Sequence, residues 1–176
     1  MQVVIKYIRA HILSILFALI TLYLMAWIFS FSSEVSEVSN ATSEGVCYFI
    51  SSVFVKGFTS LSQEAQEAKI QELVPIVRKI AHFLIYAALG FFAYLTKGAY
   101  SLEKGAEYKW VKTSVISVAF CLLYAVSDEV HQLFVSGRSG SVRDVFIDLS
   151  GAAVGVCFAV LAFLIFIKIK NKASQK

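Results

Sequence analysis

Long apolar runs are the feature that most constrains how this chain can fold. The first extends from Ile8 to Phe31, and three more cover about residues 76–96, 111–126 and 142–167. An α-helix needs about 20 predominantly apolar residues to cross a bilayer. Charged residues make up 16% of the chain, against about 25% in soluble domains. The sequence therefore predicts an all-α, polytopic membrane protein, built as a four-transmembrane-helix bundle.

Two other membrane arrangements fit less well. A cleaved signal peptide has an apolar region of about 7–15 residues, and the first run is longer, which favours a retained helix. A β-barrel needs many alternating segments of about ten residues, and none stands out. Because the sequence contains no evident internal repeat, we expect residues 1–176 to form a single transmembrane domain.

Residues 32–75 form the longest connection between two predicted spans. Val46–Phe58 is apolar but too short to cross, so we expect a short interfacial or re-entrant helix in the first outer loop. Ser60-Leu61-Ser62-Gln63 matches a capping box that would open a short polar helix. Pro75 suits either the first turn of the next helix or a kink between two helices.

The distribution of positive charge predicts the orientation in the membrane. Four spans place both termini on one side. The termini and the middle loop carry ten of the sixteen Lys and Arg residues, so the positive-inside rule places both termini in the cytoplasm and the protein in the cell membrane. Because these residues flank apolar runs, the net charge of +4 indicates topology, and no nucleic-acid partner is expected. The outer side carries six: Lys56, Lys69, Arg78, Lys79, Arg138 and Arg143.

Polar residues enter the second and third spans mainly from the predicted outer end. Arg78, His82 and Tyr86 are four residues apart and share a helix face. An interfacial anchor explains an Arg, Lys or Tyr at this depth but suits His82 less, since it lies one turn deeper. The third span ends with Asp128-Glu129-Val130-His131-Gln132. A solvated helix end is the alternative interpretation, but charges within a span are usually paired and functional, which favours a functional role or an ion pair between helices.

The turn Gly137–Ser141 and the start of the fourth span add an anion-binding pattern. A helix N-terminus beside Arg138 and Arg143 attracts anions. Ser141-x-x-Asp144 also matches a capping box, which gives Asp144 a structural alternative. Asp148 shares a stripe with Gly151 and Gly155, a G-x-x-x-G pair that lets another helix approach closely. An oligomer could form through these two glycines.

These patterns predict one polar site at the outer face. We expect no cofactor and no metal, because neither H-E-x-x-H nor a comparable ligand motif is present, and the three cysteines lack C-x-x-C spacing. The candidate residues are His82, Asp128, Glu129, Gln132, Arg138, Asp144 and Asp148, with Arg78, Arg138 and Arg143 as the anion-binding residues.

The order and spacing of these motifs resemble the VanZ-like family of bacterial membrane proteins. Glu34 stands where the family pattern is expected to have Gln. The resemblance implies a bacterial envelope protein and a link to low-level resistance to teicoplanin, a glycopeptide that binds cell-wall precursors. The matching elements are Phe31-Ser32-Ser33, Lys79-x-x-His82-Phe83-x-x-Tyr86-x-x-Leu89-Gly90, Ser127-Asp128-Glu129-Val130-His131-Gln132-x-Phe134, Gly137-Arg138-Ser139-Gly140-Ser141 and Asp144-x-x-x-Asp148-x-x-Gly151.

Two functions remain open at this point, with a third ranked below them. The first is recognition of an anionic group on a membrane lipid or a lipid-linked cell-wall precursor. The second is a membrane-embedded hydrolase or transferase acting on a lipid head group, for which the site offers acids, bases and ligand atoms. A transporter ranks last, because four spans are few for alternating access and no inverted repeat is evident.

Overall fold

The structure is a computed structural model that describes residues 11–105 and 108–173. The regular elements within these ranges are all helices. Four of them are long and apolar enough to cross a membrane: Ile12–Ser32, Gln63–Glu103, Trp110–Gln132 and Val142–Ile169. The predicted all-α membrane protein with four candidate spans is therefore confirmed; Ile8–Ala10 of the first run lie outside the described residues. In chain order the helices are α2 (Ile12–Ser32), α3 (Ser36–Phe54), the 3₁₀ helix η1 (Phe58–Ser60), α4 (Gln63–Glu103), α5 (Trp110–Gln132) and α6 (Val142–Ala173).

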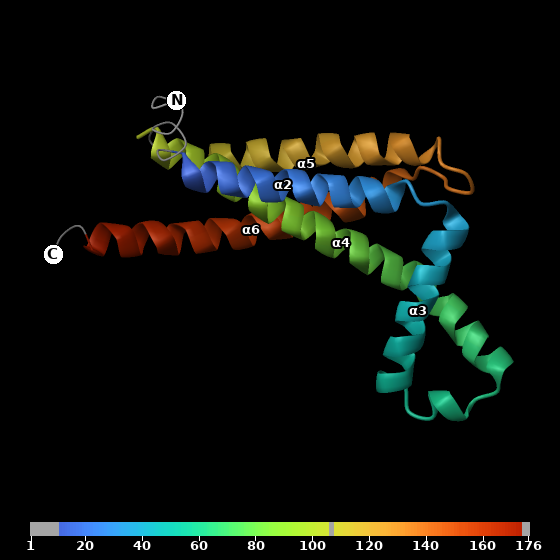
Figure 1. The fold of residues 1–176 in the computed structure, drawn as a ribbon. Coiled ribbons are helices and arrows are strands. Elements are labelled where there is room, and N and C mark those ends of the chain that lie inside the picture. The colour runs from blue at the N-terminus through green and yellow to red at the C-terminus, as the bar shows by residue number, and fades with distance from the viewer. Residues whose placement is uncertain (1–10, 106–107, 174–176) are drawn as a thin grey trace.

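The four long helices run side by side, with the connections alternating between the two ends of the bundle. In Figure 1 the start of α2 and the end of α6 lie at the same end as the α4–α5 connection, and the α5–α6 connection lies at the opposite end. This up-and-down arrangement agrees with an even number of spans. The orientation of the bundle in a membrane remains a prediction.

Helix α4 is much longer than a bilayer crossing requires. Its 41 residues extend over about 62 Å at 1.5 Å per residue, about twice the hydrocarbon thickness. The first part of α4 therefore projects beyond the other spans and forms an arm with α3 (Figure 1). Whether α3 lies in the interface or enters the membrane stays a prediction.

The start of α4 corrects two expectations. The helix cap is Ser62, whose Oγ accepts the Ala65 N–H at 3.4 Å, and not Ser60. The helix also continues through Pro75, so the expected separate polar helix is wrong. Local sequence favoured a boundary because proline removes a backbone donor and restricts the preceding residue. Packing outweighs that preference, since α4 shares a small core with α3 and η1, made of Cys47, Phe58, Ile70 and Val74.

Helices α4 and α6 approach each other closely. A Cβ added at Gly155 would lie 1.8 Å from the Ala87 carbonyl oxygen, and one added at Gly151 would lie 2.2 Å from that of Phe83. The two backbones therefore touch where the sequence supplies small residues, as in membrane helix pairs generally. This surface of Gly151 and Gly155 is covered by α4 of the same chain and is not open to a second copy.

A carboxylate from α4 caps the first turn of α2. Glu103 Oε1 accepts the backbone N–H groups of Leu13 and Ser14, each at 3.1 Å. Its other oxygen bonds the Ser14 hydroxyl and lies 3.3 Å from His11 Nδ1. Because the first N–H groups of a helix have no partner within the helix, these bonds fix the position of α2 against α4.

Candidate functional site

The centre of the site consists of three polar side chains from three helices. His82 of α4, Asp128 of α5 and Asp148 of α6 each place one ligand atom within 4.8 Å of the other two. Asp128 is 3% exposed and Asp148 is fully buried, while the His82 side chain is 27% exposed. These three residues are called the buried triad below. The helical repeat brings them to a common depth because each lies near the same end of its span.

Asp128 is held by two hydrogen bonds to one of its oxygens. Ser32 Oγ of α2 donates to Oδ2 at 2.9 Å, and Gln132 Nε2, one turn further along α5, donates to the same atom at 3.2 Å. The other oxygen, Oδ1, is buried and accepts no hydrogen bond within the described residues. The carboxylate is therefore fixed in orientation with one oxygen left to bind a further group.

Asp148 has even fewer partners. Its Oδ1 lies 3.5 Å from His82 Nδ1, and neither oxygen accepts a hydrogen bond from a described residue. In the described part of the chain, six buried side-chain atoms lack a hydrogen-bond partner, and five of them belong to the buried triad and the adjacent Tyr86. An unsatisfied buried polar group costs about 1–3 kcal/mol. Their concentration at one point marks the triad as a place for a ligand that the protein itself does not supply.

Glu129 takes the capping role that the sequence suggested for Asp144. Glu129 Oε2 accepts the backbone N–H of Ser141, immediately before α6, at 2.6 Å. Asp144 instead lies 3.9 Å from Lys79 Nζ, and both side chains are about 40% exposed. The expected Ser141–Asp144 capping box is therefore wrong. The Ser141 N–H is instead bonded by Glu129 of another helix, a contact that the local sequence does not indicate.

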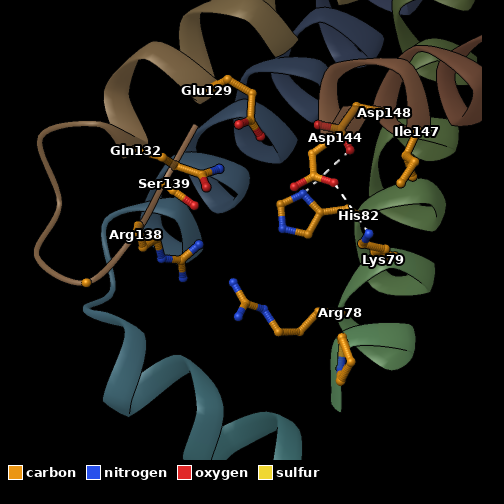
Figure 2. Close-up of a pocket in the computed structure, with 12 residues that line it drawn as sticks. Arg78, Lys79, His82, Glu129, Gln132, Arg138, Ser139, Asp144, Ile147 and Asp148 are labelled. Carbon is orange, nitrogen blue, oxygen red and sulfur yellow. Dashed lines mark ion pairs between the residues drawn. The ribbon is translucent and has the colours of Figure 1, made fainter. Parts of the chain in front are cut away.

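Two arginines face each other beside the triad. Figure 2 shows the guanidinium groups of Arg78 and Arg138 pointing toward one another. Arg138 donates from Nε to the Glu34 carbonyl oxygen at 2.9 Å and from Nη2 to that of Phe31 at 2.8 Å. Burial lowers the pKa of the Arg138 guanidinium, and the positive charge of Arg78 lowers it further.

Neither of these two arginines forms an ion pair with a carboxylate in the described residues. Arg78 Nη1 donates to the neutral Asn40 side chain at 3.3 Å. Over residues 11–105 and 108–173, no Asp or Glu oxygen lies within 4 Å of the nitrogens of either guanidinium. Two unpaired guanidinium groups that face one another repel, and an anion between them would remove the repulsion.

The arginines and part of the triad line one pocket of about 230 Å³ (Figure 2). Its walls come from α4, the end of α5, the α5–α6 turn and the start of α6. Asp128 lies beneath it and is not part of the lining. The lining residues are Pro75, Arg78, Lys79, His82, Glu129, Gln132, Gly137, Arg138, Ser139, Asp144, Ile147 and Asp148.

The family model described as VanZ/LLP1 matches residues 17–166, nearly the whole chain. The chain belongs to the VanZ/LLP1 family. The helices that carry the pocket all lie largely within the matched range. Neither the comparison with curated proteins nor the comparison with solved structures gives a match.

The Phe31-Ser32-Ser33 segment at the end of α2 contacts α5 and the α5–α6 turn. Ser32 bonds Asp128, and Ser33 Oγ lies 3.1 Å from His131 Nε2. The His131 ring also stacks on Phe29 with centroids 4.5 Å apart, which places it away from the pocket. Glu34 contributes its backbone oxygen to Arg138, so this bond does not depend on whether Glu or Gln stands there.

The structure brings together most of the residues that the sequence singled out in this VanZ/LLP1 protein. Arg143 is the exception, since it is exposed and does not line the pocket. Sequence reasoning missed Ser32 and Ser139; Ser32 could have been found from its place in the Phe31-Ser32-Ser33 motif. The seven predicted site residues lie at the pocket or directly beneath it: His82, Asp128, Glu129, Gln132, Arg138, Asp144 and Asp148.

The buried triad also bears on the expectation that this family member holds no metal. That expectation rested on the absence of a local ligand motif. Two carboxylates and one imidazole are suitable ligands for several divalent ions, and here they converge from three helices. Because no two of the three ligands share a helix, no spacing in the sequence could have indicated the group.

Proposed function

We propose that this VanZ/LLP1 protein recognises a phosphate-bearing head group of a membrane lipid or lipid-linked cell-wall precursor in the pocket between α4, α5 and α6. The observation that carries the proposal is the pair of facing guanidinium groups of Arg78 and Arg138, neither of which has a carboxylate partner in the described residues. Guanidinium groups bind phosphate through two parallel hydrogen bonds.

The position of the pocket also supports a membrane-anchored ligand. It lies at the end of the bundle opposite the start of α2, where the spans meet the arm of α3 and α4. A head group can reach this level while its acyl or prenyl chain remains in the bilayer. With the termini in the cytoplasm, as the charge distribution indicates, the pocket opens to the outer face of the cell membrane. A part in glycopeptide resistance, which the family name suggests, then rests on binding a cell-wall precursor.

Arg78→Ala tests this proposal most cleanly. A hydrogen bond to a charged group contributes about 1.5–3 kcal/mol, so loss of Arg78 should weaken phosphate binding by about 10- to 150-fold, at 1.4 kcal/mol per tenfold change. Arg138 is a poorer probe, because its removal also frees two backbone carbonyls at the end of α2. Binding is measured by native mass spectrometry of the purified full chain with undecaprenyl phosphate and, separately, with phosphatidylglycerol.

Lys69→Ala is the matched control, since it removes one positive charge from an exposed position of the same helix. It should leave binding unchanged. Weakening confined to undecaprenyl phosphate identifies a cell-wall carrier as the source of the phosphate, and weakening confined to phosphatidylglycerol identifies a phospholipid. If Arg78→Ala bound each of the two lipids as tightly as the wild type does, the proposed anion site would be refuted.

A second candidate function is a membrane-embedded hydrolase or transferase acting on the same head group. The observation that favours it is the buried triad beneath Arg78 and Arg138, because carboxylates and an imidazole beside a bound phosphate can act as acid, base or metal ligands. Incubation of the purified chain with each lipid, followed by mass spectrometry of the products, distinguishes the two functions. A product that Asp128→Asn no longer forms supports an enzyme, and an unchanged lipid pool supports recognition alone.

A further inference from the structure

The buried triad carries an inference that does not depend on the proposed anion site. Its members lie at the junction of α4, α5 and α6, and each contributes a buried atom without a hydrogen-bond partner in the described residues: His82 Nδ1, Asp128 Oδ1 and both oxygens of Asp148. We propose that His82, Asp128 and Asp148 bind one divalent metal ion between these three helices.

The spacing of the ligand atoms fits a shared ion after a small movement. One ligand atom from each residue lies within 4.8 Å of the others. Metal–ligand distances of about 2.1 Å place two tetrahedral ligands of one ion about 3.4 Å apart. The ligand atoms must therefore approach one another by up to about 1.4 Å, which rotation of the side chains can supply.

Burial of charge makes a cation the natural occupant. Asp148 is fully buried and Asp128 is 3% exposed, and buried charges in proteins are paired or coordinate metals. Asp148 has His82 within ion-pair distance. The two hydrogen bonds to Asp128 come from the neutral side chains of Ser32 and Gln132. A divalent ion offsets both carboxylates at once and fills the open acceptor positions.

The contacts around Asp128 match those usually found around a metal ligand. Ligating side chains are oriented by outer hydrogen bonds, whose loss typically costs 10- to 100-fold in metal affinity. Ser32 and Gln132 supply such bonds to Oδ2, and the opposite oxygen remains available. Ser32 thus acts as a positioning residue for Asp128.

The ligand set narrows the choice of ion. Imidazole suits Zn²⁺ and other transition ions, carboxylates suit Mn²⁺ and Mg²⁺, and Ca²⁺ prefers six to eight oxygen ligands. Mn²⁺ and Zn²⁺ are therefore the probes of choice. Three protein ligands leave coordination positions open toward the pocket, and the positive ion would counter the repulsion that two carboxylates exert on an incoming phosphate.

Titration of the metal-free full chain in detergent with Mn²⁺, followed by electron paramagnetic resonance of the unbound ion, tests the proposal. We expect about one Mn²⁺ per chain, displaced by Zn²⁺. His82→Gln and Asp148→Asn should each weaken binding by more than about 100-fold, and Ser32→Ala by about 10- to 100-fold. His131→Gln is the matched control, since this histidine lies at the same end of the bundle but stacks on Phe29, and it should bind as the wild type does.

Two results would overturn the proposal. Failure of the wild type to bind Mn²⁺ or Zn²⁺ stoichiometrically overturns the proposal and points to a protonated triad, and this result needs no variant. Equal affinity of wild type and Asp148→Asn, with both folded by size exclusion, also overturns it; Asp128→Asn replaces Asp148→Asn if the latter does not fold. Arg78→Ala should keep the metal, so loss of phosphate binding and loss of metal binding are separate outcomes.

Discussion

Replacement of Gly155 by alanine is the most direct test of how the bundle is assembled. The new Cβ would lie 1.8 Å from the Ala87 carbonyl oxygen, whereas real Cβ contacts essentially never fall under 3.0 Å. The obstacle is backbone, which cannot rotate away as a side chain can. Helices α4 and α6 must therefore separate locally by at least about 1.2 Å, from 1.8 to 3.0 Å.

The cost of that separation follows from the packing it disturbs. Overpacking of a well-packed contact typically costs about 1–3 kcal/mol, and alanine's better helix propensity returns at most about 1 kcal/mol. The contact between α4 and α6 is the most extensive in the bundle, so we expect the upper part of this range. At about 2–4 °C per kcal/mol for a chain of this size, the apparent melting temperature should fall by several degrees.

The assay is thermal unfolding of purified protein in detergent, followed by size exclusion. Gly45→Ala is the matched control, because it makes the same substitution inside α3, where an added Cβ has no neighbour within 4 Å, and it should be neutral or stabilising. If Gly155→Ala melted with the wild type, the close approach of α4 and α6 would be refuted. If it instead shifted a dimer to a monomer without loss of stability, the two glycines would face a second copy of the chain and not α4.

Two further predictions concern the ends of the bundle. Glu103→Ala should destabilise the protein by about 1–2 kcal/mol, as loss of a helix cap does, because the first turn of α2 loses its acceptor. Thermal unfolding measures this change. A melting curve of the variant that matches the wild type would show that water replaces the carboxylate without cost. In a cysteine-free background, Ser62→Cys should react with a membrane-impermeant maleimide added to whole cells, whereas Lys104→Cys should not. Labelling of Lys104→Cys from outside would reverse the proposed orientation and place the pocket in the cytoplasm.

Much of the site was predictable because helical periodicity is a local property. Arg78 and His82, four residues apart, had to share a face of their helix, and the same holds for Asp128 and Gln132. Each of these pairs indeed lies at the pocket or directly beneath it. The part that could not be predicted is which faces meet. Arg138 donates to backbone oxygens at the end of α2, and Glu129 caps the start of α6. Each contact joins two distant segments, so neither could be predicted from one segment alone.

The sequence by itself determined the class of the protein and the number of its spans, because the bilayer sets a required length of apolar helix and each span meets it alone. Tertiary structure alone decided that α4 continues through Pro75, since the supporting core is shared with α3. It alone decided that three ligands from α4, α5 and α6 converge. Length and hydrophobicity act within one segment, whereas the rotation of a helix about its axis depends on the backbone contacts of its neighbours, such as those at Gly151 and Gly155.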